Sequence, residues 1–173
     1  IMREMAVSPE DRKTVRPARK AAEEAQKGGK GNKGIFCGAA IELHDGTIIT
    51  GKNSPLMHSA PSLILNAVKH LAGIPDKLHL LSPNIIESVT KFKENILGAK
   101  STNMDLDETF IALTISATTN ATAQAALEKM KDLKGCEVHM THIPTPGDEA
   151  GLKRLGINLT ADPNLTRGSS FDV

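Results

Sequence analysis

The sequence contains no tryptophan and no tyrosine, and only four phenylalanines among its 173 residues. The core must therefore be built from aliphatic side chains, and hydrophobic residues supply an ordinary 39% of the chain. A chain of this length can bury a stable core as one domain. The scarcity of aromatic rings also argues against a nucleic-acid partner, because proteins that bind single strands usually stack the bases on aromatic side chains.

Cysteines and long apolar runs are also scarce. Cys37 and Cys136 are far apart and lack a CxxC spacing, so we expect neither a disulfide framework nor a thiolate zinc site. A reduced, cytoplasmic setting follows from that cysteine usage. No apolar run could span a bilayer and no signal-peptide pattern opens the chain, so we expect no membrane partner. The formal net charge of +1 gives no broad field that would attract polyanions.

The first 27 residues predict a helical segment. Ser8-Pro9-Glu10-Asp11 is typical of a helix start, and Pro17 is expected to kink or restart the helix before it continues to Lys27. Basic residues from Arg3 onward are interleaved with acidic ones, which favours a solvated, ion-paired helix over a nucleic-acid patch. The opening Ile1-Met2 leads us to expect that the chain is part of a larger protein.

Residues 28–34, Gly-Gly-Lys-Gly-Asn-Lys-Gly, predict a flexible basic linker. A phosphate-binding role is conceivable for such glycines. However, the run lacks a Gly-Lys-Ser/Thr ending and follows no predicted strand, so we favour a linker. The expected organisation is then a helical segment at 1–27, this linker, an α/β domain at 35–162 and a polar tail at 163–173.

Strands and helices alternate in the predicted domain, which implies a sheet with helices packed on both of its faces. His44-Asp45-Gly46 predicts the turn of a hairpin. We expect helix rather than strand at 106–118, despite its β-branched residues, because Asp107 and Glu108 suit a helix N-terminus. The predicted strands are 35–43, 47–50, 78–82, 136–142 and 157–161. The predicted helices are 61–72, 84–97, 106–118, 121–133 and 148–155.

Short motifs in the first half of the chain resemble the cytidine deaminase family. Phe36-Cys37-Gly38-Ala39-Ala40, His44-Asp45-Gly46 and Thr50-Gly51-Lys52-Asn53 are similar to that family's opening hairpin. Leu80-Leu81-Ser82-Pro83 looks like the strand end that leads into its zinc-binding helix. The resemblance implies a three-layer, deaminase-like α/β domain with a central mixed sheet of about five strands.

The reaction of that family requires three zinc ligands and a glutamate that shuttles protons, in an H-x-E…P-C-x-x-C pattern. In this sequence His58 matches the first ligand, but Ala60 stands at the glutamate position. Asn84 and Glu87 stand where the two cysteines would be. Because alanine cannot act as an acid or a base, the resemblance implies the scaffold without the usual zinc-dependent deamination. We therefore expect no metal and no cofactor.

An oxygen-rich metal site built from His58, Asn84 and Glu87, together with His142, is an alternative. We favour a simpler interpretation, in which His58 lies at a helix entry and Glu87 lies in a first helical turn and stabilises its dipole. His139 and His142 should not converge on one metal, because their odd spacing on a strand points them to opposite faces.

Other candidate residues follow the strand at 136–142. His142 lies near its carboxyl end, where open α/β sheets tend to bind ligands. Thr145, Pro146 and Asp148 are typical of a helix cap, and the same helix N-terminus could instead hold an anion such as phosphate. The candidate catalytic residues are His58, Glu87, His142 and Asp148. The candidate ligand-binding residues are Asn53, Asn84 and Thr145.

The whole chain resembles the C-terminal part of a bacterial family known as domain of unknown function eighteen forty-six. The motifs that carry this resemblance are Met2–Arg12, Gly38–Asn53, Leu80–Glu87, Ser116–Asn120 and Leu155–Thr160. It implies a longer N-terminal portion that has a glycine-rich, nucleotide-binding-like loop, and it carries over no established catalytic residue.

Two hypotheses about function follow. In the first, the chain is a non-catalytic accessory domain of a larger nucleotide-binding protein, whose partners are its own N-terminal portion and further copies in a homo-oligomer. In the second, it is an enzyme domain that uses the deaminase-like pocket without zinc on a nucleotide or phosphorylated metabolite.

Overall fold

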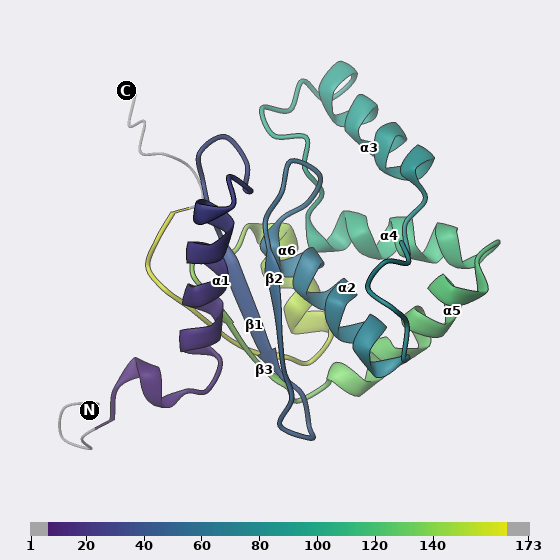
Figure 1. Cartoon of the computed structure of the whole chain (residues 1–173). Helices are drawn as coiled ribbons and strands as arrows, with labels where there is room; N and C mark the ends of the chain where they lie inside the picture. Colours follow the sequence, from purple (N-terminus) through teal and green to yellow (C-terminus); the bar gives the residue numbers. More distant parts are fainter. Residues whose placement is uncertain (1–6, 166–173) are drawn as a thin grey trace.

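The computed structural model describes residues 7–165, which form an open four-stranded mixed sheet with helices packed against it (Figure 1). The strand order is β2-β1-β3-β4. β1 runs antiparallel to both of its neighbours, whereas β3 and β4 are parallel. The strands are β1 (Gly38–Glu42), β2 (Ile48–Lys52), β3 (Glu137–Met140) and β4 (Asn158–Ala161).

The predicted hairpin is confirmed in β1 and β2, which pair from Gly38 opposite Lys52 to Glu42 opposite Ile48. Asp45 stabilises the connecting turn because its Oδ1 accepts a hydrogen bond of 2.9 Å from the Thr47 amide. Gly46 adopts φ +85°, a conformation that side chains disfavour. The Asp-Gly chemistry that predicted the turn therefore also stabilises it.

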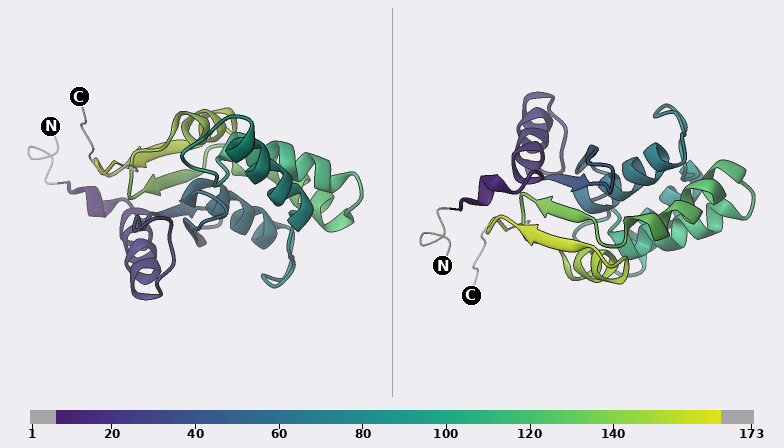
Figure 2. Two further views of the ribbon diagram at one scale, coloured as in Figure 1. Left: turned by 90° about the horizontal axis from the view of Figure 1, so that it is seen from above. Right: turned by 90° about the horizontal axis from the view of Figure 1, so that it is seen from below.

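Helices cover both faces of the sheet. α1 (Val15–Lys27) packs on one face of β1 and β2, and α2 (Ser59–Leu71) packs on the other. Two glycines allow these close approaches. A Cβ on Gly38 would lie 2.6 Å from the amide nitrogen of Ala22 in α1, and one on Gly51 would lie 2.5 Å from Leu63 Cα in α2. Figure 2 shows α1 and the C-terminal helix α6 on opposite sides of the strands.

Of the four remaining helices, all but the first begin at a residue whose side chain caps them. Asp105 Oδ1 accepts from the Glu108 amide, Asn120 Oδ1 accepts from Thr122 and Ala123, and Thr145 accepts from Asp148. Such caps satisfy amide groups that a helix leaves unpaired in its first turn. These helices are α3 (Pro83–Asn95), α4 (Leu106–Ala117), α5 (Ala121–Glu128) and α6 (Pro146–Arg154). The helix expected at 106–118 is thus confirmed.

The prediction of a strand at 78–82, and with it a sheet of about five strands, is wrong for the residues described. This segment is a turn, in which the Leu78 amide bonds to the Pro75 carbonyl at 3.0 Å, and the sheet has four strands. Leu80 and Leu81 are only 3% and 5% exposed. The apolar run therefore fills the core without pairing, and apolar character alone cannot distinguish the two cases.

The start of the chain also differs from expectation. Ser8 precedes only a short 3-10 helix, η1 (Pro9–Asp11), and α1 begins afresh at Val15. Pro17 lies in the first turn of α1, where its missing N–H removes no helical bond. A second 3-10 helix, η2 (Lys129–Leu133), ends the segment predicted as one helix at 121–133. Arg3 and residues 166–173 of the predicted tail lie outside the described residues.

The main core lies between the sheet and the helices on the α2 side, and it is aliphatic as the composition requires. Its largest fully buried members come from β1, α2, α4, η2 and α6: Ile41, Leu63, Ile64, Leu106, Leu113, Leu133 and Leu152. The α1 layer is thinner, because alanines at 18, 21 and 25 form its buried face. Burial of this apolar surface is the main force that holds the layers together.

Candidate functional site

Polar residues gather at one edge of the sheet. β2, β3 and β4 run in the same direction and end there, while β1 begins there. Asn53 follows β2, Thr141 follows β3, Asp162 follows β4 and Cys37 precedes β1. We call this region the carboxyl edge. It is where open α/β folds tend to bind ligands, as the placement of His142 by sequence suggested.

His58 and Asp148 meet at this edge. His58 is the N-cap residue of α2, and Asp148 lies in the first turn of α6. The His58 Nδ1 donates to Asp148 Oδ2 at 2.7 Å, and the side chains are 21% and 3% exposed respectively. The structure therefore brings together two of the four candidate catalytic residues.

Both carboxylate oxygens of Asp148 accept hydrogen bonds within the domain. Its Oδ1 accepts from the Leu106 amide at 2.9 Å, and its Oδ2 accepts from the Thr145 hydroxyl at 2.9 Å as well as from His58. Leu106 begins α4 and Thr145 caps α6. One buried carboxylate thus ties together the first turns of α2, α4 and α6, whose dipoles favour a negative charge there.

The second ring nitrogen of His58 is also occupied. Its Nε2 lies 3.2 Å from Asn103 Oδ1, which the Ser101 hydroxyl also contacts. Burial, the largest single effect, lowers the pKa of His58, but the hydrogen bond and charge of Asp148, with the charge of Asp105, outweigh it and raise the pKa. A protonated ring donates to both oxygens, which matches this geometry.

Asp105 lies beside the same group. Burial raises the pKa of its carboxyl group, although the Glu108 amide bond opposes that shift. A Cβ on Gly147 would overlap the Asp105 carboxylate, so the start of α6 packs directly against it. Asp105 therefore lies between the first turns of α4 and α6.

The remaining polar groups of the carboxyl edge mostly bind backbone. Asn53 Oδ1 accepts from the Cys37 amide at 2.8 Å, and its Nδ2 donates to the Ile35 carbonyl at 2.9 Å. The Thr141 hydroxyl accepts from the Gly38 amide and lies 2.9 Å from His142 Nδ1. Burial lowers the pKa of His142, so a neutral ring is favoured. Burial also raises the pKa of the Cys37 thiol to about 12, with Asp148 adding to the shift.

Sequence reasoning missed a second charged group at this edge, around Asp162. Arg19 of α1 binds both of its oxygens, at 3.0 and 2.8 Å, and also pairs with Glu10. His139 Nε2 lies 3.3 Å from Asp162 Oδ1 without the alignment of a hydrogen bond, while its Nδ1 bonds to Thr160. Burial lowers the pKa of His139. No sequence signal linked residues so far apart, and the group joins α1 to the sheet.

Asn84 and Glu87 do not join the carboxyl-edge cluster. Both are exposed on α3, where Glu87 pairs with Lys91 at 2.6 Å and the Asn84 carbonyl accepts from the Ser88 hydroxyl. Within residues 7–165 no group of three or more His, Cys, Asp or Glu side chains is arranged to hold a metal ion. The alternative metal site of His58, Asn84 and Glu87, together with His142, is therefore not assembled.

The other face of α3 carries exposed apolar side chains. Ile85 and Val89 contact the core, but Phe92, Ile96 and Leu97 further along the chain are 53%, 69% and 61% exposed. α3 projects from the body of the molecule and packs against α4 (Figure 1). Two apolar residues of α4, Ile111 and Ile115, are likewise 64% and 51% exposed. We call these five exposed residues the α3–α4 apolar face.

The chemistry available to this arrangement is limited by its internal bonds. A histidine that is hydrogen-bonded to a buried carboxylate can transfer protons in many enzymes. Here both ring nitrogens face acceptors inside the protein. The same arrangement orients three helices, so it can act as a structural tie whether or not a ligand is present.

Comparisons with known proteins identify relatives over nearly the whole chain. A family model described as "Domain of unknown function DUF1846, C-terminal" matches residues 10–171. A UPF0371 protein of Clostridium botulinum (strain ATCC 19397 / Type A) is 47% identical over 172 residues, which is 99% of this chain and 34% of that protein. UPF0371 proteins of Clostridium tetani and Corynebacterium aurimucosum are 44% and 43% identical over 99% of the chain, which is 34% and 32% of their lengths.

The chain therefore spans about a third of the length of the curated relatives it matches. None of the described helices is long and apolar enough to cross a membrane. The family-model match covers most of the chain. The chain belongs to the DUF1846 family, and it corresponds to the C-terminal domain of that family.

Proposed function

We propose that this chain is a non-catalytic accessory domain of a larger, nucleotide-binding bacterial protein. In this proposal the α3–α4 apolar face packs against the N-terminal portion of that protein. The carboxyl edge keeps the domain rigid and does not perform chemistry. The same proposal includes the domain organisation that the sequence predicts, which is a helical segment, a linker, a deaminase-like α/β unit and a tail.

The observation that carries the proposal is the exposure of Phe92, Ile96 and Ile111, each more than half accessible to solvent. Exposed apolar side chains on two helices that contact each other are typical of interaction sites. The relatives are about three times as long as the chain, so another part of the same polypeptide could cover the α3–α4 apolar face. We therefore favour the N-terminal portion over a second copy as the occupant.

The hydrogen bonds that His58 and Asp148 make within the domain support the non-catalytic part of the proposal. Both oxygens of Asp148 and both ring nitrogens of His58 have partners within the domain. A general base needs a free lone pair within reach of the proton it removes. Both ring nitrogens of His58 are occupied by acceptors of the domain, so the residue offers none to a substrate.

The test compares this chain alone with a full-length family protein in which it forms the C-terminal third. Hydrogen exchange of the α3 amides should slow at least tenfold in the full-length protein. The double substitution Phe92→Glu and Ile96→Glu should restore fast exchange there and leave the melting temperature of the isolated chain unchanged. Asn95→Glu, an exposed change on the same helix, is the matched control and should alter neither measurement.

Equal exchange of α3 in the two proteins would refute the docking role. If the isolated chain forms an oligomer that Phe92→Glu dissociates, a second copy is the occupant and the proposed N-terminal partner is wrong. Size-exclusion chromatography with light scattering distinguishes these outcomes.

One observation favours an enzyme domain as the second candidate. The His58–Asp148 pair lies at the carboxyl edge, at the position that matches the first zinc ligand of the deaminases, and it could handle a small molecule without zinc. A thermal-shift screen of nucleotides and phosphorylated metabolites separates the two candidates. Stabilisation of the isolated chain that His58→Gln abolishes would support the enzyme, whereas ligands that bind only the full-length protein would support the accessory role.

A further inference from the structure

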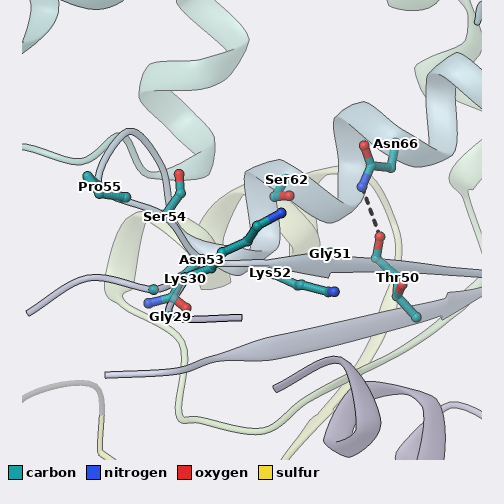
Figure 3. A pocket seen from close by; sticks show the side chains of 11 residues that line it. Gly29, Lys30, Thr50, Gly51, Lys52, Asn53, Ser54, Pro55, Ser62 and Asn66 are labelled. Atoms are coloured by element: carbon teal, nitrogen blue, oxygen red, sulfur yellow. Dashed lines mark hydrogen bonds between the residues drawn. The ribbon is translucent and has the colours of Figure 1, made fainter. Parts of the chain in front are cut away.

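A cavity of about 540 Å³ lies away from the His58–Asp148 pair, between α2, the free edge of β2 and the glycine-rich segment 28–34 (Figure 3). Its size falls in the range of small-molecule sites. The residues that line it come from three segments: Gly29, Lys30 and Gly31; Thr50 to Pro55; and Ser62 and Asn66 of α2. The segment that the sequence predicts to be a linker thus forms one wall of a cavity.

The charged residues that line this cavity are all basic. Lys30 and Lys52 line it, and no aspartate or glutamate does. Lys52 is held by Glu24 of α1 at 3.0 Å, while Lys30 is exposed and forms no ion pair with the residues that the structure describes. Glu24 offsets the charge of Lys52, so Lys30 supplies the unpaired positive charge of a wall that contains no carboxylate, and such a wall favours an anion.

Unused hydrogen-bonding groups face the same space. Asn66 Nδ2 donates to the Thr50 carbonyl at 2.9 Å, which fixes the amide and leaves its Oδ1 as an acceptor (Figure 3). Within residues 7–165 the Ser62 hydroxyl makes no hydrogen bond. Ser62 and Asn66 are four residues apart, so they lie on one face of α2.

The backbone of β2 supplies another donor. The Asn53 amide bonds to the Cys37 carbonyl on the β1 side of the strand. Because successive residues of a strand point their N–H groups to opposite sides, the Lys52 amide points to the free edge, toward the cavity. No backbone partner among the described residues takes that amide.

We propose that this cavity binds a small phosphorylated metabolite. Lys30, Lys52 and the Lys52 amide bind the phosphate group, and Ser62 and Asn66 bind hydroxyl groups on the remainder of the molecule. Lys52 exchanges its contact with Glu24 for the phosphate when the ligand enters. Ammonium groups and backbone N–H groups together form the charge-assisted contacts that phosphate sites use. This site is separate from the docking role and would persist if that role were refuted.

The test titrates the isotopically labelled chain with glycerol 3-phosphate, with inorganic phosphate and with glycerol at constant ionic strength. Amide resonances of Lys30, Lys52, Ser62 and Asn66 should shift together and saturate with glycerol 3-phosphate. Inorganic phosphate should bind at least threefold more weakly, and glycerol should not bind. The double substitution Lys30→Met and Lys52→Met should weaken binding about tenfold or more.

Lys131→Met is the matched control, since it removes one exposed lysine from η2, which does not line the cavity, and binding should stay within twofold. Ser62→Ala is a second variant and should reduce binding of glycerol 3-phosphate but not of inorganic phosphate. Equal affinity for both anions would overturn the metabolite proposal in favour of a simple phosphate site. Absence of saturable shifts, or binding unchanged in the double variant, would overturn the site altogether.

Discussion

His58 and Asp148 are separated by 90 positions in the sequence, yet their side chains are joined by a hydrogen bond of 2.7 Å. The bond connects the first turn of α2 to the first turn of α6, and the Leu106 amide adds α4 to the same carboxylate. Three helices that are far apart in the sequence are thus connected through the carboxylate of Asp148. The consequence is that one buried side chain links the starts of three helices, in addition to the apolar core between them.

Removal of that charge should destabilise the domain. Asp148→Asn keeps the size of the side chain but leaves His58 without its buried counter-ion. We expect the free energy of unfolding to fall by about 3 kcal/mol, the usual cost of removing one partner of a buried pair. Urea denaturation followed by circular dichroism measures it.

Asp132→Asn is the control for this change. Asp132 is 41% exposed and lies 3.7 Å from Lys129, so its loss should cost less than about 0.5 kcal/mol. An Asp148→Asn chain as stable as the control would show that the carboxylate is not a structural tie.

The raised pKa of His58 predicts how stability depends on pH. The unfolded chain releases the His58 proton near pH 6.5, while the folded chain holds it to a higher pH. The stabilisation is therefore complete below about pH 6.5 and is lost as pH rises through the folded pKa, with a slope of at most about 1.4 kcal/mol per pH unit. His58→Gln should abolish this decline in urea titrations at successive pH values.

His139 should act in the opposite direction. Burial lowers the pKa of His139 in the folded chain. Below about pH 6.5 the unfolded chain therefore binds a proton at this residue more readily than the folded chain does. Stability should therefore rise as pH increases toward that value. His139→Gln should reduce this rise, to which His142 also contributes because burial lowers its pKa, and should leave the decline above pH 6.5 in place. If one substitution removed both the rise below pH 6.5 and the decline above it, the two effects could not be assigned to different histidines.

The local elements of this fold could be predicted because each has a local cause. Asp45-Gly46 predicted the hairpin turn, and Asp107 and Glu108 predicted the start of α4, since each acts within a few residues. The strand wrongly predicted at Leu78–Ser82 shows the limit of such reasoning. Leu80 and Leu81 are buried as expected, whereas Leu78 is 42% exposed, and pairing in a sheet is decided by the neighbours that the fold supplies.

The candidate site was predicted only in part for the same reason. His58 was identified from its match to the first zinc ligand of the deaminases and Asp148 from its place at a helix start, but nothing local predicts that α2 and α6 begin side by side. Glu87 was identified from a motif match, and the helix that carries it turned out to be exposed. The cavity beside Lys52 depends on the segment 28–34 returning to the edge of β2, which composition cannot reveal.

The Cys37 thiol should be almost inert in the folded chain. Burial raises its pKa to about 12, so at pH 8 only about one thiol in ten thousand is ionised, and the thiolate is the reactive form. Alkylation by iodoacetamide at pH 8 should be about a thousandfold slower in buffer than in urea, measured by mass spectrometry of the peptide that contains Cys37. Rapid alkylation of the folded chain would mean that the carboxyl edge is open to small molecules, which would favour the enzyme candidate.

The close contact between β2 and α2 should not tolerate a single added methyl group at Gly51. A Cβ there would lie 2.5 Å from Leu63 Cα, a backbone atom that cannot rotate away, so the helix must move. Overpacking of this kind costs about 1–3 kcal/mol, and we expect Gly51→Ala to lie at the upper end because the whole helix is displaced.

Gly38→Ala provides a comparison on the opposite face. Its Cβ would lie 2.6 Å from the Ala22 amide nitrogen in α1, so a loss of similar size is expected. Gly28→Ala is the control, since its φ of −83° suits alanine and its nearest contact is 3.2 Å from the Glu24 carbonyl oxygen. It should change stability by less than about 1 kcal/mol. Thermal unfolding of the three variants tests the layered packing directly, because a tolerated Gly51→Ala would mean that α2 does not lie directly against β2.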